Sequence, residues 1–163
     1  MVFSFPGLFI ICVFLICCNV NYSQSIEEAQ NKALTENKKI IVSIYTHWCL
    51  WCKKMEDVVY SNPMVKNMIE DKFIPVRLNA EGNTNVKYNG IELTEEELAL
   101  YFQAYSYPAT VFLEPNGIPV YFYYDNYLMI NLPGYFGVDE FLKILAFILE
   151  GKYKNTDLST VIN

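Results

Sequence analysis

Two cysteines separated by two residues, Cys49 and Cys52, follow a short apolar stretch of the chain. That stretch, residues 40–45, is rich in β-branched side chains, which predicts a buried strand leading into a helix that begins near Cys49. At a helix start, unpaired N–H groups and the positive end of the helix dipole stabilise a thiolate, so the pKa of the thiol falls below its free value of about 8.5. The fold must therefore contain a strand-to-helix turn that carries a reactive pair of thiols.

The spacing of the two cysteines predicts reversible disulfide chemistry. Cys49 is the predicted nucleophile, and Cys52, one turn further along the helix, is the predicted resolving thiol that releases a reduced partner from a mixed disulfide. As a structural staple the pair would be weak, because so short a loop removes little entropy from the unfolded chain. A zinc site would need two further ligands, yet His47 is the only histidine and the other three cysteines lie in an apolar leader.

The length and charge of the chain limit its function classes. With 163 residues, of which 53% are hydrophobic, the chain fits one compact domain and a leader. The net charge is −6, and no run of Lys or Arg is longer than a pair, so the footprint of a nucleic-acid-binding protein is missing. We expect neither a nucleic-acid partner nor a bound cofactor or metal.

Residues 1–25 form the predicted leader. Residues 2–20 are almost wholly apolar, and small residues follow in Ser23-Gln24-Ser25, which is typical of a signal peptide. The amino end lacks Lys and Arg, and the apolar stretch is nearly long enough to span a bilayer, so an uncleaved N-terminal membrane anchor is the first alternative. Lipid attachment at Cys18 is the second. All three interpretations predict an exported domain that is periplasmic or otherwise extracytoplasmic.

The rest of the chain alternates helices with strands. Helices are expected at residues 25–37, 49–60, 63–69, 94–104 and 137–150, and strands at residues 40–45, 73–79, 109–113 and 118–124. The turn signal Asn89-Gly90 predicts a small hairpin inserted between residues 86 and 93. Pro75 cannot donate a backbone hydrogen bond, which favours an edge position for its strand. Residues 152–163 are expected to be a loose tail.

This order of elements, together with four motifs, resembles the thioredoxin fold over about residues 26–150. The motifs are Trp48-Cys49, Cys52-Lys53, Tyr107-Pro108 and Gly134-Tyr135. The resemblance implies an α/β domain, residues 26–151, with a central mixed β-sheet flanked by helices and a small hairpin and helix inserted before a cis-proline. Within the superfamily, residues 48–56, the insertion and residues 132–135 look like the exported thioredoxin-related proteins of the SoxW kind, with the C-terminal domain of the DsbD family second.

The resemblance also implies a place for the substrate. Pro108 would follow a cis peptide bond beside the cysteines and offer the backbone of Tyr107 to an extended substrate segment. Trp48 and Trp51, with Tyr107, would form an apolar rim that accepts this segment. The alternative for the two tryptophans is packing within the domain.

The chain departs from the commonest thioredoxin pattern in the residue type at position 43. Ser43, six residues before Cys49, stands where thioredoxins usually bury an Asp that helps to deprotonate the resolving thiol. Glu56 lies one helical turn past Cys52 and is the nearest candidate to carry this proton instead. The alternative is that Glu56 is an ordinary solvated side chain.

We therefore expect an exported thiol-disulfide oxidoreductase that reduces protein disulfides through Cys49 and Cys52. The residues between them, Leu50 and Trp51, supply neither a proline nor a cationic histidine, so the pair should be more reducing than a DsbA-like oxidant. The expected partners are disulfide-containing protein substrates and, by resemblance, a membrane electron-donor protein. Two alternatives stay open: an oxidase or isomerase of secreted proteins, and a thioredoxin-like binding module with a passive disulfide. The sequence leaves the oligomeric state open.

Overall fold

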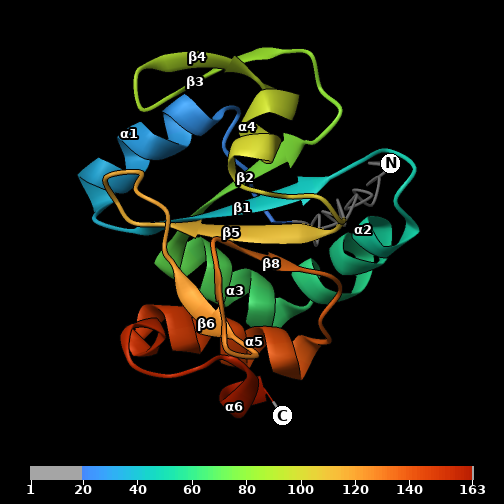
Figure 1. Cartoon of the computed structure of the whole chain (residues 1–163), viewed down its shortest axis with the longest axis vertical. Helices are drawn as coiled ribbons and strands as arrows, with labels where there is room; N and C mark the ends of the chain where they lie inside the picture. The colour runs from blue at the N-terminus through green and yellow to red at the C-terminus, as the bar shows by residue number, and fades with distance from the viewer. Residues whose placement is uncertain (1–19, 163) are drawn as a thin grey trace, which may run out of the picture.

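A four-stranded mixed sheet runs through the centre of the domain (Figure 1). Its order is β2 (Phe73–Asn79), β1 (Lys39–Tyr45), β5 (Ala109–Leu113) and β8 (Asn131–Pro133). β1 pairs with β2 in parallel and with β5 antiparallel, and β5 pairs antiparallel with β8. The computed structural model describes residues 20–162, so most of the predicted leader, with its alternatives of anchor and lipid attachment, lies outside the described residues.

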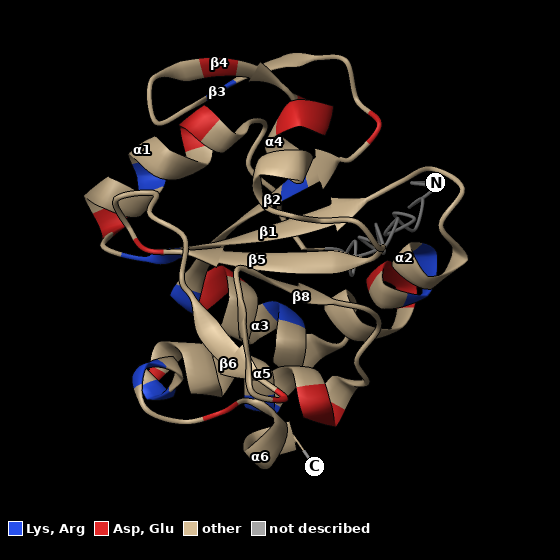
Figure 2. Cartoon of the chain, viewed as in Figure 1, with Lys and Arg blue, Asp and Glu red and all other residues tan. Residues whose placement is uncertain are grey.

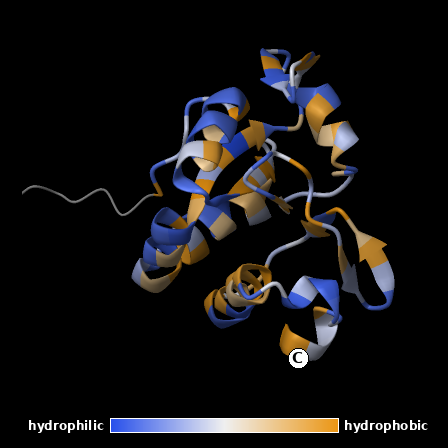
Figure 3. Cartoon of the chain, turned by 90° about the vertical axis from the view of Figure 1, so that its left-hand side faces the viewer, coloured by the Kyte–Doolittle hydropathy of each residue, from blue (hydrophilic) through white to orange (hydrophobic). Residues whose placement is uncertain are grey.

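Helices cover both faces of this sheet. The helices α1 (Ile26–Glu36) and α4 (Glu95–Tyr101) lie on one face, and α3 (Pro63–Lys72) and α5 (Val138–Leu149) lie on the other (Figure 1). Successive residues of a strand point to opposite faces, so Ile40 and Val42 belong to the apolar cluster of α1, whereas Ile41 belongs to the cluster of α5. In Figure 3, orange hydrophobic residues make up much of the central strands. The predicted mixed sheet with flanking helices is confirmed.

The predicted insertion is also present. The strands β3 (Asn85–Tyr88) and β4 (Ile91–Thr94) form a hairpin, in which Asn89 and Gly90 have φ values of 50° and 82°. These left-handed conformations are those that an Asn-Gly turn supplies at low cost. Thr94 then caps α4 in a capping box with Glu97.

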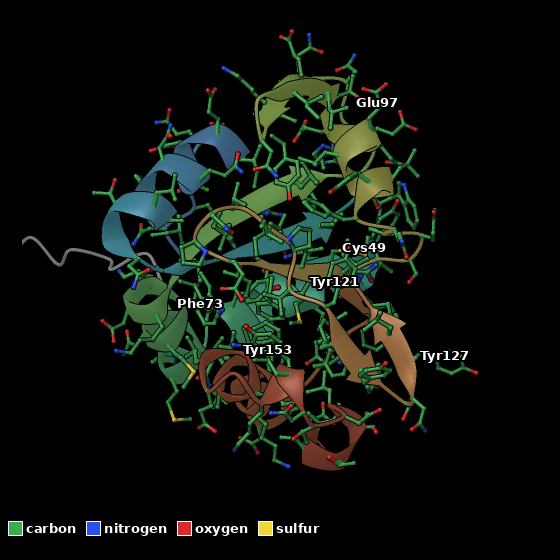
Figure 4. All side chains as sticks on the ribbon, turned by 60° about the vertical axis from the view of Figure 1, so that its left-hand side comes forward. Cys49, Phe73, Glu97, Tyr121, Tyr127 and Tyr153 are labelled. Carbon is green, nitrogen blue, oxygen red and sulfur yellow. A yellow bond between two sulfur atoms is a disulfide. The ribbon has the colours of Figure 1, made fainter. Side chains whose placement is uncertain are left out.

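The strand expected at residues 118–124 does not form as predicted. After the turn at residues 114–117, the chain makes a single bridge between Leu113 and Pro119, beside which the N–H of Val120 donates to the carbonyl of Phe112 at 2.8 Å, and it then leaves the sheet. The strand β6 (Phe122–Tyr124) instead pairs with β7 (Tyr127–Met129) in a separate hairpin, and β8 takes the place beside β5. Figure 4 shows Tyr127 of this hairpin pointing away from the domain, and it is 73% exposed.

The expectation of a loose tail after Lys152 is wrong for the described residues. The tail contains the 3₁₀ helix η2 (Lys152–Lys154) and the helix α6 (Ser159–Ile162). Leu158 is only 1% exposed and belongs to the core cluster of α5, and its N–H donates to the carbonyl of Tyr123 at 2.8 Å. The buried side chain of Leu158 and its hydrogen bond to Tyr123 of the β6–β7 hairpin, which is distant in sequence, hold this segment in place.

The folded domain also begins earlier than residue 26. In the segment of residues 20–23, called here the N-terminal segment, Val20 is buried in the core. Asn21 donates to the carboxylate of Glu70 at 2.9 and 2.7 Å, and Ser23 donates its N–H to the carbonyl of Pro75 at 2.8 Å. Cleavage at the predicted site, residues 23–25, would therefore remove part of the folded domain. Within residues 20–162 no helix is long and apolar enough to cross a membrane.

Candidate active site

The two cysteines lie at one end of the sheet, where β1 passes into the helix α2 (Leu50–Lys54). Cys49 is the N-cap of α2, and the N–H of Cys52 donates to Cys49 Sγ at 3.0 Å. The two residues form a disulfide, and both are buried, with 7% and 8% of their surface exposed. Figure 4 places Cys49 at this end of the sheet. The predicted strand-to-helix turn is present, and its thiols lie where helix N–H groups can stabilise a thiolate.

Exposed aromatic side chains surround the disulfide. Trp48 and Trp51 are 66% and 53% exposed. Trp48 meets the edge of Tyr107 at a ring-centroid distance of 6.3 Å, and Trp51 lies 5.3 Å from the ring of Tyr135. The tryptophans are therefore not part of the core. The structure brings Trp48 and Tyr107 together as the sequence predicted.

A groove of about 330 Å³ adjoins this rim, with Trp51 as one of its walls. Its other lining residues are Tyr107, Pro108, Gly134 and Tyr135. The Tyr107–Pro108 peptide bond is cis, and the N–H of Gly134 donates to the carbonyl of Pro108 at 2.7 Å. Gly134 has a φ of 98°, a conformation that other residues rarely adopt. The motifs Tyr107-Pro108 and Gly134-Tyr135, distant in sequence, thus form one surface with Trp51, the residue between the two cysteines that directly precedes Cys52.

Charged side chains flank the rim. Glu81 accepts a hydrogen bond from the indole Nε1 of Trp48 at 2.8 Å. Burial raises the pKa of Tyr107, and the nearby carboxylates of Glu81 and Glu96 raise it further. On the other side, the ammonium group of Lys54 lies 4.8 Å from the ring of Trp51.

Glu56 is half-buried rather than freely solvated. It belongs to the π-helix η1 (Met55–Tyr60), which continues α2, and its Oε2 accepts a hydrogen bond from the hydroxyl of Tyr22 at 3.0 Å. Burial, followed by the charges of Tyr60 and Glu56, raises the pKa of Tyr22, so this hydroxyl keeps its proton and remains a donor. The N-terminal segment thus contacts the helix that carries Cys52.

Hydroxyl groups occupy the region where thioredoxins bury a carboxylate. Ser43 is buried, with 7% of its surface exposed, and its hydroxyl partly offsets the effect of burial on the pKa of Tyr60. The hydroxyl of Tyr60 is 3.5 Å from Thr110 Oγ1, and burial raises the pKa of Tyr60. Sequence reasoning missed Tyr60 and Thr110. The only available signal was that Tyr60 stands eight residues, about two helical turns, after Cys52.

Among the described residues, no group of three or more His, Cys, Asp or Glu is arranged to hold a metal ion.

Comparison with known proteins identifies the family. The family model Thioredox_DsbH, described as "Protein of unknown function, DUF255", matches residues 16–159, which is well over half of the chain. The chain belongs to this family. It is also similar to human "Spermatogenesis-associated protein 20", with 29% identity over 94 residues that cover 55% of this chain. The match covers 11% of the human protein, so the chain spans only a small part of that relative's length.

Solved structures agree on the fold. A thioredoxin-fold protein from Helicobacter pylori superposes with a TM-score of 0.63 and 22% identity, covering 78% of this chain and 81% of the other. A DsbH oxidoreductase gives a TM-score of 0.58 and 18% identity, with coverage of 81% and 85%. The reduced C-terminal domain of Neisseria meningitidis DsbD gives 0.52 and 18%, with coverage of 74% and 90%. At these identities the likeness shows the fold alone, and it confirms the thioredoxin fold. The likeness to SoxW proteins stays a prediction.

Proposed function

We propose that the protein is an exported thiol-disulfide oxidoreductase that reduces disulfides in other proteins. One observation carries this proposal: Cys49 and Cys52 form a closed disulfide at a helix start, under a rim of exposed aromatic side chains and beside a groove. A purely structural disulfide needs no such surroundings. Membership of the Thioredox_DsbH family and the name of the DsbH oxidoreductase support the same class of reaction.

The reaction balances with the two cysteines alone. The Cys49 thiolate attacks one sulfur of a substrate disulfide, forms a mixed disulfide and releases the other substrate sulfur as a thiolate. Cys52 then attacks Cys49 Sγ, which releases the second substrate thiolate and leaves the Cys49–Cys52 disulfide. Two electrons pass to the substrate, so a further dithiol must reduce the pair again. We propose that a membrane electron-donor protein supplies these electrons, as in the proteins that the sequence resembles.

The neighbouring residues receive supporting roles in this proposal. Trp48, Trp51, Tyr107 and Pro108 hold an extended segment of the substrate against the groove. Glu56 accepts the proton of the resolving thiol, and its hydrogen bond from the N-terminal segment keeps the carboxylate in place. We retain the SoxW-like assignment as the finer family proposal.

The direction of electron flow can be tested by the equilibrium reduction potential of the cysteine pair. The absence of Pro and His between the cysteines predicts a pair that is more reducing than DsbA; a value near that of thioredoxin, about −270 mV, would support a reductant, and one near that of DsbA, about −120 mV, would favour an oxidase. The fluorescence of the tryptophans in dithiothreitol or glutathione buffers reports the potential. Export is tested separately, by locating the protein in cell fractions.

A trapping experiment separates an enzyme from a binding module. In the variant Cys52→Ser the mixed disulfide cannot be resolved, so an enzyme accumulates adducts through Cys49. The variant Cys49→Ser is the matched control and should give no adducts. A binding module with a passive disulfide would bind its partner equally well in both variants and trap nothing.

A further inference from the structure

Two carboxylates, Glu81 and Glu96, belong to the part of the rim that contains Trp48 and Tyr107. Glu81 is exposed and accepts a hydrogen bond from Trp48, and Glu96 is exposed in the first turn of α4. Trp48 in turn contacts the ring of Tyr107, and the two carboxylates raise the pKa of Tyr107 in addition to burial. Figure 2 shows acidic residues on the loop that follows β2 and at the start of α4, on the side of the sheet that α4 covers.

These two carboxylates differ from the acidic residues beside them. Glu95 and Glu97 accept backbone N–H groups, from Asn79 at 3.2 Å and Thr94 at 2.8 Å. Glu81 is bound only by neutral donors, and in the described part of the chain neither Glu81 nor Glu96 forms a salt bridge. Two negative charges at the rim are therefore open to a positively charged side chain.

A positive charge lies at two other residues that line the groove, Trp51 and Tyr135. Lys54 is exposed, and its ammonium group lies 4.8 Å from the ring of Trp51 and 4.9 Å from that of Tyr135, both of which line the groove. Within residues 20–162, Lys54 has no salt-bridge partner, whereas its neighbour Lys53 pairs with Asp57. The two rings fix the position of the ammonium group without neutralising its charge.

We infer that the groove selects substrates by the order of charges along the segment that carries the reacting cysteine. A basic side chain fits the side of Trp48 and Tyr107, and an acidic side chain fits the side of Trp51 and Tyr135. We take the extended segment to lie in the groove in one direction, so that one order of charges is favoured and the reverse order places like charges together. This inference rests on the proposed reduction of protein disulfides and adds the class of substrate to it.

Four peptides test the inference. Each carries one cysteine in a mixed disulfide with 2-mercaptoethanol, which is uncharged. The cysteine is flanked by Lys before and Glu after, by Glu before and Lys after, by Lys on both sides, or by Glu on both sides. The full-length protein is reduced and freed of reductant, and its oxidation by each peptide is followed by acid quench, alkylation and mass spectrometry. Each event consumes one protein dithiol and releases one peptide thiol and one 2-mercaptoethanol.

We expect the two mixed-charge peptides to differ in rate by about tenfold, with the uniformly charged peptides between them, because several modest exposed charge pairs add up. Raising the salt concentration from about 20 mM to about 0.5 M should remove most of this ratio, since exposed charges are screened. Two variants should each reduce this ratio of rates. One is Lys54→Met, and the other combines Glu81→Gln with Glu96→Gln. They keep the shape of the side chains, so a packing role would not move the ratio.

The outcomes separate the two proposals. Equal rates for all four peptides would overturn the charge selection and leave the reductase proposal intact. A ratio that survives in the charge variants would also overturn it. If no peptide oxidises the reduced protein, the proposed function itself fails.

Discussion

Replacing Leu158 by Ala tests whether the C-terminal segment is part of the hydrophobic core. The side chain is 1% exposed and packs in the cluster that contains α5, so truncation removes its buried contacts and leaves a cavity. Such substitutions cost about 2–5 kcal/mol in free energy of unfolding. A loss of about 3 kcal/mol corresponds to a fall in Tm of about 6–12 °C for a domain of this size.

The measurement is urea unfolding of the oxidised protein, with thermal unfolding as a second reading. The matched control is Leu34→Ala on α1, where the leucine is 61% exposed. The control should change the free energy of unfolding by less than about 0.5 kcal/mol. If the Leu158 variant unfolds at the same urea concentration as the control, the segment does not contribute to the core and our reasoning is refuted.

Three further predictions follow from contacts between distant parts of the chain. Removing the N-terminal segment should lower the urea midpoint, because buried Val20 is lost; an unchanged midpoint would show that the domain does not need this segment. Burial raises the pKa of the Glu114 carboxyl, but hydrogen bonds from Lys39 and Tyr153 outweigh burial, so the pKa lies below its ordinary value. This interaction stabilises the fold above the unfolded pKa of about 4.3 and is lost as pH falls through the lower folded pKa, so Glu114→Gln should flatten stability against pH in that acid range. Glu56→Gln should slow resolution of a mixed disulfide near neutral pH without changing its formation, as rapid-quench kinetics would show; equal resolution rates would remove Glu56 from the mechanism.

The features that the sequence alone determined are local ones. The strand before Cys49, the N-cap at that residue and the Asn89-Gly90 hairpin follow from interactions among residues only a few positions apart. Side-chain periodicity, caps and turn residues encode such interactions directly. For this reason the elements as far as β5, the helix α5 and the thiol pair could be predicted, and with the resemblance they led to the right fold.

The tertiary structure alone decided which distant segments meet. Residues 131–133 became the strand beside β5, whereas residues 118–124 keep only a single bridge to it, at Pro119. Tyr22 reached Glu56 across 34 residues, and Tyr60 reached Thr110 across 50. A propensity describes a residue and its near neighbours, whereas these contacts depend on competition among many similar apolar segments for one core. The contacts of Glu56 and Tyr60, on the helix that follows the thiol pair, therefore depend on the packing of the whole chain.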